Sequence, residues 1–200
     1  MELTGVQKLA RALRIMVIIA LLCNIAALVF MPGIVAFRQM QISWTDVVRD
    51  VTVGGDFFFE PASPLSFLLF YGLCFLEGFV TVWHEAYTAV LTVFLWTCGI
   101  CTAVILWQAK WVLDTIREGK TFTLGNAANL KRAAVCCFVI SAAALVRTVW
   151  GLFYYQSIAP LLTYNFLFVP MFVLAGLVCM VMSALFRQAA ELKAENDLTI

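Results

Sequence analysis

The chain has 200 residues, of which 64% are hydrophobic and 12% are charged, and its formal net charge is +1. Soluble domains carry roughly 25% charged residues, so a water-soluble domain of this length could not bury so much apolar surface, and lipid must act as its solvent. No basic run is present, which argues against direct nucleic-acid binding because that requires clustered cations to neutralise phosphates.

The first apolar run, Ile15–Phe37, follows a cationic lead that contains Lys8, Arg11 and Arg14. About 20 apolar residues suffice to cross a bilayer at a rise of about 1.5 Å per residue. No small-residue cleavage site follows the run, so we predict an uncleaved signal anchor. Pro32 is expected to kink or terminate this helix near its outer end.

A polar segment, Arg38–Pro64, separates the first run from a long apolar block, Leu65–Ile116. The second half of the block, about Tyr87–Leu113, has the cleaner pattern of a membrane span. The first half, Leu65–Val82, is compatible with a span, a re-entrant piece or an interfacial helix.

Two further spans are predicted at Ala133–Phe153 and Leu161–Phe186, joined by a short turn with aromatic residues at the membrane interface. Charges of alternating sign in Arg187–Asn196 indicate that the last helix continues beyond the membrane. In the polar segment before the third span, Gly119 is a natural helix stop and Thr123 can cap the next helix.

The distribution of cations orients the chain. Lys110–Arg132 holds five of the thirteen Lys and Arg residues, and the positive-inside rule places this segment and both termini in the cytoplasm. An even number of crossings must then separate these three regions, so Leu65–Val82 cannot be a simple fifth span. We predict a single all-α integral membrane domain, a polytopic four-helix bundle with an outer-leaflet or re-entrant helical segment between spans one and two. Its parts are spans at about 15–37, 87–113, 133–153 and 161–186, an extracytoplasmic region 38–86, a cytoplasmic loop 114–132 and a cytoplasmic tail 187–200.

Four ionisable residues in apolar surroundings form a candidate intramembrane polar cluster: Glu77, His84, Glu85 and Arg147. A charge inside a span needs a partner, and an Arg147–Glu77 ion pair would tie the ambiguous segment to the third helix. The single histidine lacks the spacing of a metal site. Structural pairing, interfacial anchoring and a transport role all stay open for this cluster.

All seven cysteines lie in apolar runs, and Cys98 and Cys101 form a C-x-x-C pair. A redox or metal pair is one interpretation, but we favour packing residues because no second ligand pair or histidine accompanies them. No phosphate-binding loop, nucleophile elbow or pair of catalytic carboxylates is present. We therefore expect no cofactor, no metal and no enzymatic activity.

Two motifs carry a family resemblance. IREGKTFTLGNAANLKR follows the second full span, and QAAELKAENDLTI closes the chain. Together they resemble the bacterial membrane family catalogued as domain of unknown function 2975, through Gly119, Lys120, Phe122, Asn126, Leu130 and Lys131 and then Glu195–Ile200. The resemblance covers about Tyr87–Ile200. It implies a four-helix protein of the bacterial cell membrane, often encoded beside a small Cro-like helix-turn-helix regulator, with no assigned enzymatic activity.

The cationic loop and the terminal segment supply a candidate partner surface, made of Gly119, Lys120, Phe122, Asn126, Lys131, Arg132, Glu195, Asn196, Asp197, Leu198 and Ile200. Our first hypothesis is a non-enzymatic membrane protein that binds and regulates a small helix-turn-helix regulator through this surface. The cations could instead only obey the positive-inside rule, with the tail solvated. The alternative function is a small transporter, or a ligand or lipid sensor, with an outward-facing polar pocket. The oligomeric state stays open.

Overall fold

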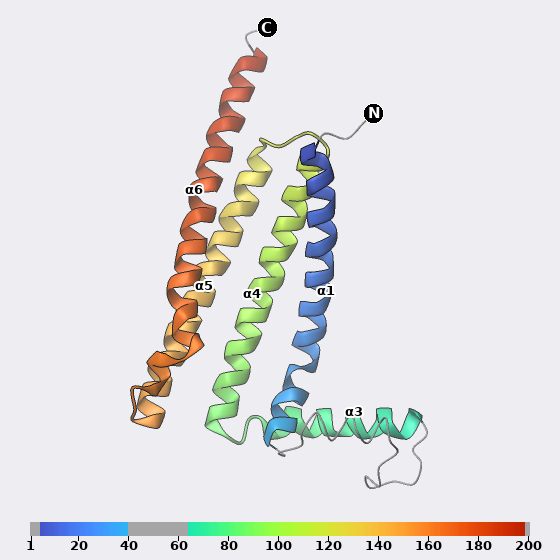
Figure 1. Cartoon of the computed structure of the whole chain (residues 1–200), viewed down its shortest axis with the longest axis vertical. Coiled ribbons are helices and arrows are strands. Elements are labelled where there is room, and N and C mark those ends of the chain that lie inside the picture. Colours follow the sequence, from blue (N-terminus) through green and yellow to red (C-terminus); the bar gives the residue numbers. More distant parts are fainter. Residues whose placement is uncertain (1–4, 40–63, 199–200) are drawn as a thin grey trace. The chain divides into compact units, whose positions relative to one another are not determined.

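The computed structural model describes residues 5–39 and 64–198. Within these ranges the fold is all-α, as predicted (Figure 1). The elements are α1 (Gly5–Gln39), α3 (Pro64–Thr81), α4 (Ala86–Arg117), α5 (Leu124–Tyr155), the short 3-10 helix η1 (Ala159–Leu162) and α6 (Tyr164–Leu198). Residues 40–63, about half of the predicted extracytoplasmic region 38–86, and Ile200 of the predicted partner surface lie outside the described residues.

Four segments of these helices are long and apolar enough to cross a membrane: Lys8–Met31, Ala86–Arg117, Leu124–Tyr155 and Tyr164–Asn196. The shortest of them would span about 36 Å at 1.5 Å per residue, more than the hydrocarbon core of about 30 Å. The predicted order of four spans is therefore confirmed as four candidate membrane helices. The predicted segment Leu65–Val82 corresponds to the 18-residue helix α3, Pro64–Thr81. Its placement as an outer-leaflet or re-entrant helix stays a prediction.

Pro32 was predicted to kink or terminate the first helix. Termination is wrong, because α1 continues to Gln39, and the kink stays a prediction. A proline removes one backbone donor, but the hydrogen bonds on either side of it remain. Ending the helix in an apolar environment would leave several more backbone groups unpaired, which costs more than one lost bond. The last helix shows the same tolerance, since Pro170 lies inside α6.

The chain divides into two compact units. The first comprises Met1–Ala26 and Trp96–Ile200, and thus the start of α1, the second part of α4, and all of α5, η1 and α6. The second, Ala27–Leu95, comprises the end of α1, α3 and the start of α4. The residues of the predicted partner surface all belong to the first unit.

In the first unit, α5 and α6 form an antiparallel hairpin with a regular register. The Ser183 hydroxyl donates to the carbonyl of Ala127 at 2.6 Å, and the Ser141 hydroxyl donates to the carbonyl of Val169 at 3.0 Å. Both contacts join residues equally distant from the turn near Tyr155, so the two helices stay in step along their length. Hydrogen bonds of this kind hold helices together in lipid, which supplies no hydrophobic force between them.

The packed face of α5 is made mainly of small residues. Its buried residues recur every three or four positions: Asn126, Ala127, Ala133, Ala134, Cys137, Ile140, Ser141, Ala144, Thr148 and Gly151. Small side chains let the backbones approach closely. At Gly176 of α6 there is no room for a side chain, because an added Cβ would lie 2.9 Å from the ring of Phe138.

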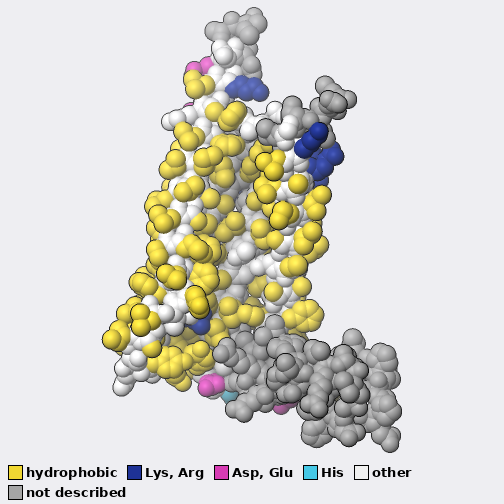
Figure 2. Space-filling view, in the orientation of Figure 1, with side chains coloured by type: hydrophobic (Ala, Val, Ile, Leu, Met, Phe, Trp, Pro, Cys, Tyr) yellow, Lys and Arg dark blue, Asp and Glu magenta, His cyan; other side chains and the backbone are white. Residues whose placement is uncertain are grey.

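The outer faces of these helices carry large apolar side chains. Leu22, Val146 and Val178 are each more than 60% exposed, on α1, α5 and α6 respectively. An apolar surface of this extent indicates contact with lipid. Lys and Arg side chains gather at the end where α1 begins and α6 ends (Figure 2), and the α4–α5 turn lies at the same end (Figure 1). This arrangement suits the predicted topology; the assignment of that end to the cytoplasm stays a prediction.

Candidate functional site at the α4–α5 turn

The end of α4 is closed by a glycine in the left-handed region. Gly119 has a φ of 77°. Its N–H donates to the carbonyl of Ile116 at 3.0 Å, and the N–H of Lys120 donates to the carbonyl of Thr115 at 2.9 Å. These bonds satisfy two of the carbonyls that a helix end leaves unpaired. The prediction of a helix stop at Gly119 is confirmed.

Thr123 caps α5, as predicted. Its backbone is extended, and its hydroxyl oxygen accepts a hydrogen bond from the N–H of Asn126 at 3.2 Å. Its carbonyl accepts the first helical bond, from Ala127 at 3.2 Å. Only six residues, 118–123, therefore separate α4 from α5, so the predicted loop 114–132 is for the most part helical.

Asn126 is a correction to the predicted partner surface, because its side chain is only 1% exposed. Its Nδ2 donates to the hydroxyl of Thr115 at 2.7 Å and to the carbonyl of Thr121 at 2.8 Å. Since a carbonyl can only accept, Thr121 fixes which amide atom is the nitrogen. Thr115 has one hydroxyl hydrogen, and it donates either to Val112 O at 2.8 Å or to Asn126 Oδ1 at 2.9 Å. Asn126 thus clasps the end of α4 to the start of α5.

Phe122 also has a structural contact. Its side chain is 50% exposed, and its ring packs against that of Phe186 on α6 with centroids 5.5 Å apart. Lys120, Lys131 and Arg132 are exposed around the turn. Gly119, Phe122 and Asn126 therefore hold the turn, and the exposed residues of the predicted surface here without such a structural role are its cations.

Helix α6 extends well past the turn. Because Phe186 contacts Phe122, the residues that follow Arg187 lie beyond the first residue of α5. This extension, Gln188–Leu198, is about 16 Å long at 1.5 Å per residue. Glu191–Asn196 is a run of exposed residues, so the extension presents every face of the helix to its surroundings. The predicted helical continuation is confirmed; the side chains of Asp197 and Leu198 lie outside the described residues.

An ion pair that the sequence analysis does not predict ties α1 to α4. Arg14 Nε lies 2.7 Å from Asp114 Oδ1, and the two side chains are 30% and 21% exposed. Both atoms are shielded from solvent, and the N–H does not point straight at the oxygen, so the contact is a close ion pair without a linear hydrogen bond. This ion pair could have been expected from the predicted topology, because the start of the first membrane helix and the end of the second lie on the same side of the membrane.

The members of the candidate intramembrane polar cluster fall in different units. Arg147 Nη1 donates to Asn165 Oδ1 at 2.9 Å, which joins α5 to α6. Glu77, His84 and Glu85 are exposed, on α3 and the turn that follows it. The Arg147–Glu77 ion pair and the polar pocket stay predictions. Asn165 could have been predicted as the partner of Arg147, because the two residues lie equally far from the turn of the antiparallel hairpin.

Cysteine thiols lie between helices. Cys101 of α4 lies close to Cys136 of α5, and Cys137 of α5 lies close to Cys179 of α6. Among the described residues, no group of three or more His, Cys, Asp or Glu side chains is arranged to hold a metal ion. These contacts favour the interpretation of Cys101 as a packing residue.

Four candidate spans with an apolar outer surface define a multi-pass helical membrane protein. The family described as "Protein of unknown function (DUF2975)" matches residues 61–200, which is most of the chain, and the protein belongs to this family. The match includes α3, which the two sequence motifs do not reach. No curated protein and no solved structure matches the chain.

Proposed function

We propose that this protein is a non-enzymatic bacterial membrane protein that holds a small helix-turn-helix transcription regulator at the cytoplasmic face of the membrane and thereby regulates it. The observation that carries the proposal is the extension of α6, Gln188–Leu198, with its run of exposed residues. A helical end of this length is marginally stable in water on its own, so a partner that packs against it would supply the missing contacts. The family resemblance implies that a small helix-turn-helix regulator is encoded beside this protein, and this regulator is the partner that we propose.

The chemistry of the extension suits such a partner. Between residues 191 and 198 it carries three acids, Glu191, Glu195 and Asp197, against the single cation Lys193. Leu192 is 65% exposed among these charges and can serve as an apolar anchor. Helix-turn-helix proteins bind DNA phosphates with basic side chains. An acidic helix would compete for those side chains, so that membrane binding and DNA binding exclude one another.

The test is co-expression of the helix-turn-helix protein encoded by the neighbouring gene, followed by membrane fractionation. Truncation after Arg187 keeps Ser183 and Phe186, which hold α6 to α5 and to the turn. We expect this variant to insert normally and to release the regulator to the soluble fraction. Leu192→Ser should weaken recruitment. Recruitment that survives the truncation would refute the proposal.

A further inference from the structure

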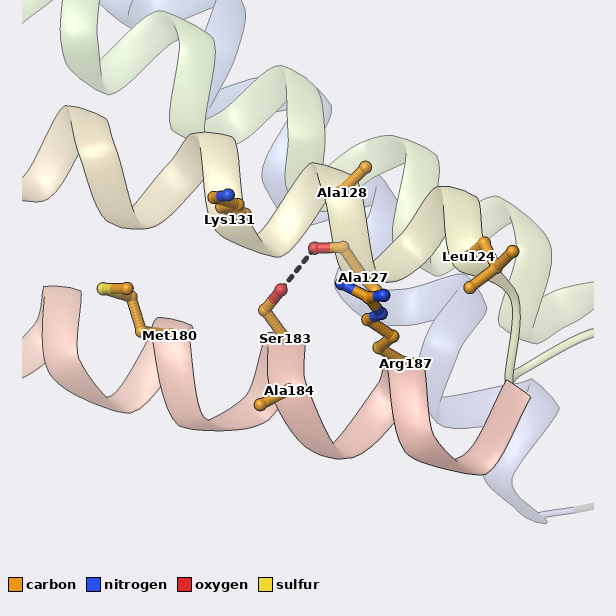
Figure 3. A pocket seen from close by; sticks show the side chains of 8 residues that line it. All are labelled: Leu124, Ala127, Ala128, Lys131, Met180, Ser183, Ala184 and Arg187. Atoms are coloured by element: carbon orange, nitrogen blue, oxygen red, sulfur yellow. Dashed lines mark hydrogen bonds between the residues drawn. The ribbon is translucent and has the colours of Figure 1, made fainter. Parts of the chain in front are cut away.

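A groove of about 430 Å³ lies between the first turns of α5 and the last membrane turns of α6 (Figure 3). Ala127 of α5 and Ala184 and Met180 of α6 give it an apolar floor, and each helix contributes one cation, Lys131 from α5 and Arg187 from α6. It lies at the α4–α5 turn end of the hairpin, away from Arg147 and Asn165.

The two cations supply the polar chemistry of this groove. Ser183 also lines it, but the Ser183 hydroxyl donates to the carbonyl of Ala127 at 2.6 Å and so serves the α5–α6 contact (Figure 3). The side chains of Lys131 and Arg187 are exposed, as are Ala128 and Ala184 beside them. The groove therefore opens outward from the hairpin instead of into the bundle.

Each cation stands at the boundary of the apolar stretch of its own helix. In the register set by Ser183 and Ala127, the Cα atoms of Lys131 and Arg187 lie about 12 Å apart along the helix axes, a distance that the two long side chains and a phosphate between them have to bridge. Lys131 comes just before the apolar stretch of α5 that starts at Ala133, and Arg187 directly follows Phe186 at the end of the apolar stretch of α6. This boundary is the level of the phospholipid head groups. Basic pockets between membrane helices at this depth are suited to anionic head groups.

We propose that this groove binds an anionic phospholipid, with the phosphate between Lys131 and Arg187 and an acyl chain along the floor beside Met180. Glu191 competes with the lipid phosphate for Arg187, because Arg187 Nε lies 2.8 Å from Glu191 Oε1. A guanidinium has five N–H donors, so the two terminal nitrogens of Arg187 still offer four to a phosphate. The truncation after Arg187 retains every residue that lines the groove, so lipid binding can be measured without the α6 extension.

The experiment is native mass spectrometry of the full-length protein in neutral detergent with phosphatidylglycerol or phosphatidylcholine of the same acyl chains. We expect the wild type to retain phosphatidylglycerol preferentially. Lys131→Gln and Arg187→Gln should each weaken that binding about fivefold, the typical effect of one cation near an anionic lipid surface. Arg132→Gln is the matched control: it removes the same charge one residue away from Lys131, at a residue that does not line the groove, and should weaken binding clearly less than Lys131→Gln does.

Two further variants separate a built site from diffuse surface charge. Ala184→Phe, or Ala128→Phe if the first does not fold, fills the groove without altering charge and should abolish the preference for phosphatidylglycerol. Glu191→Gln frees Arg187 and should strengthen binding. The proposal is overturned if Arg132→Gln weakens binding as much as Lys131→Gln, if the filled groove retains the lipid, or if Glu191→Gln weakens binding.

Discussion

Replacement of Asn126 should loosen the α4–α5 turn without unfolding the rest of the hairpin. The side chain is 1% exposed and donates two hydrogen bonds, to Thr115 and Thr121. The hydrogen bond from the Thr115 hydroxyl to Asn126 Oδ1 is left out of the energy sum, because the same hydrogen can be donated to the carbonyl of Val112. At roughly 1 kcal/mol net for each donated bond, Asn126→Ala should cost about 2 kcal/mol in the stability of the turn. Asn126→Asp should cost more, because a carboxylate has no donor for the Thr121 carbonyl and would be buried as a charge.

The assay is limited trypsin digestion in mild detergent, read at Lys120, which is exposed in the turn. Cleavage requires local opening, so about 2 kcal/mol corresponds to a rate roughly 30-fold higher. Cleavage at Lys193, on the α6 extension, serves as an internal control and should not change. Asn129→Ala is the matched variant: it lies three residues further along α5, is partly exposed, and should alter the rate at Lys120 less than about twofold. If the two alanine variants are cut at Lys120 at the same rate, the clasp assigned to Asn126 does not exist.

Two more predictions concern contacts between helices. Gly176→Val should destabilise the α5–α6 hairpin by about 1–3 kcal/mol in detergent unfolding, because the new Cβ would lie 2.9 Å from the Phe138 ring. The control is Ala175→Val at the exposed neighbouring residue, which should cost less than about 0.5 kcal/mol. Equal costs for the two variants would contradict the close packing at Gly176. Asp114→Asn should cost about 1–2 kcal/mol, between the values for exposed and buried ion pairs, since Arg14 and Asp114 are partly shielded. The exchange of the two charges, Arg14→Asp with Asp114→Arg, should recover part of the loss, whereas purely additive effects would exclude the pair.

Local features of the sequence predict the helices well. A run of apolar residues long enough to cross a bilayer requires little context, and the stop at Gly119 and the cap at Thr123 depend on the backbone within one turn of each. Pro32 does not terminate α1, because the effect of a proline depends on the solvent around the helix, and in an apolar setting continuation is favoured.

Contacts across the bundle were predicted less well because they depend on register. Asn126 lies in the most polar stretch of the chain, which suggested exposure, yet the short distance between α4 and α5 buries it. The bond from Arg147 to the neutral Asn165 was not predicted from the sequence, because charge alone points to an acidic partner; the Arg147–Glu77 pair stays a prediction. The antiparallel register of α5 and α6 makes Asn165 predictable as a neighbour once the position of the turn is known.

The structure also changes what the motif after the second span means for function. Gly119 provides a left-handed helix end, Phe122 packs against Phe186, and Asn126 clasps two helices. Loss of activity on mutation of these three residues would therefore report a disturbed turn and would not identify a contact with a partner. Residues that can be changed without disturbing the turn are the informative ones. Leu192 tests the regulator surface in this way, and Lys131, compared with Arg132, tests the lipid groove.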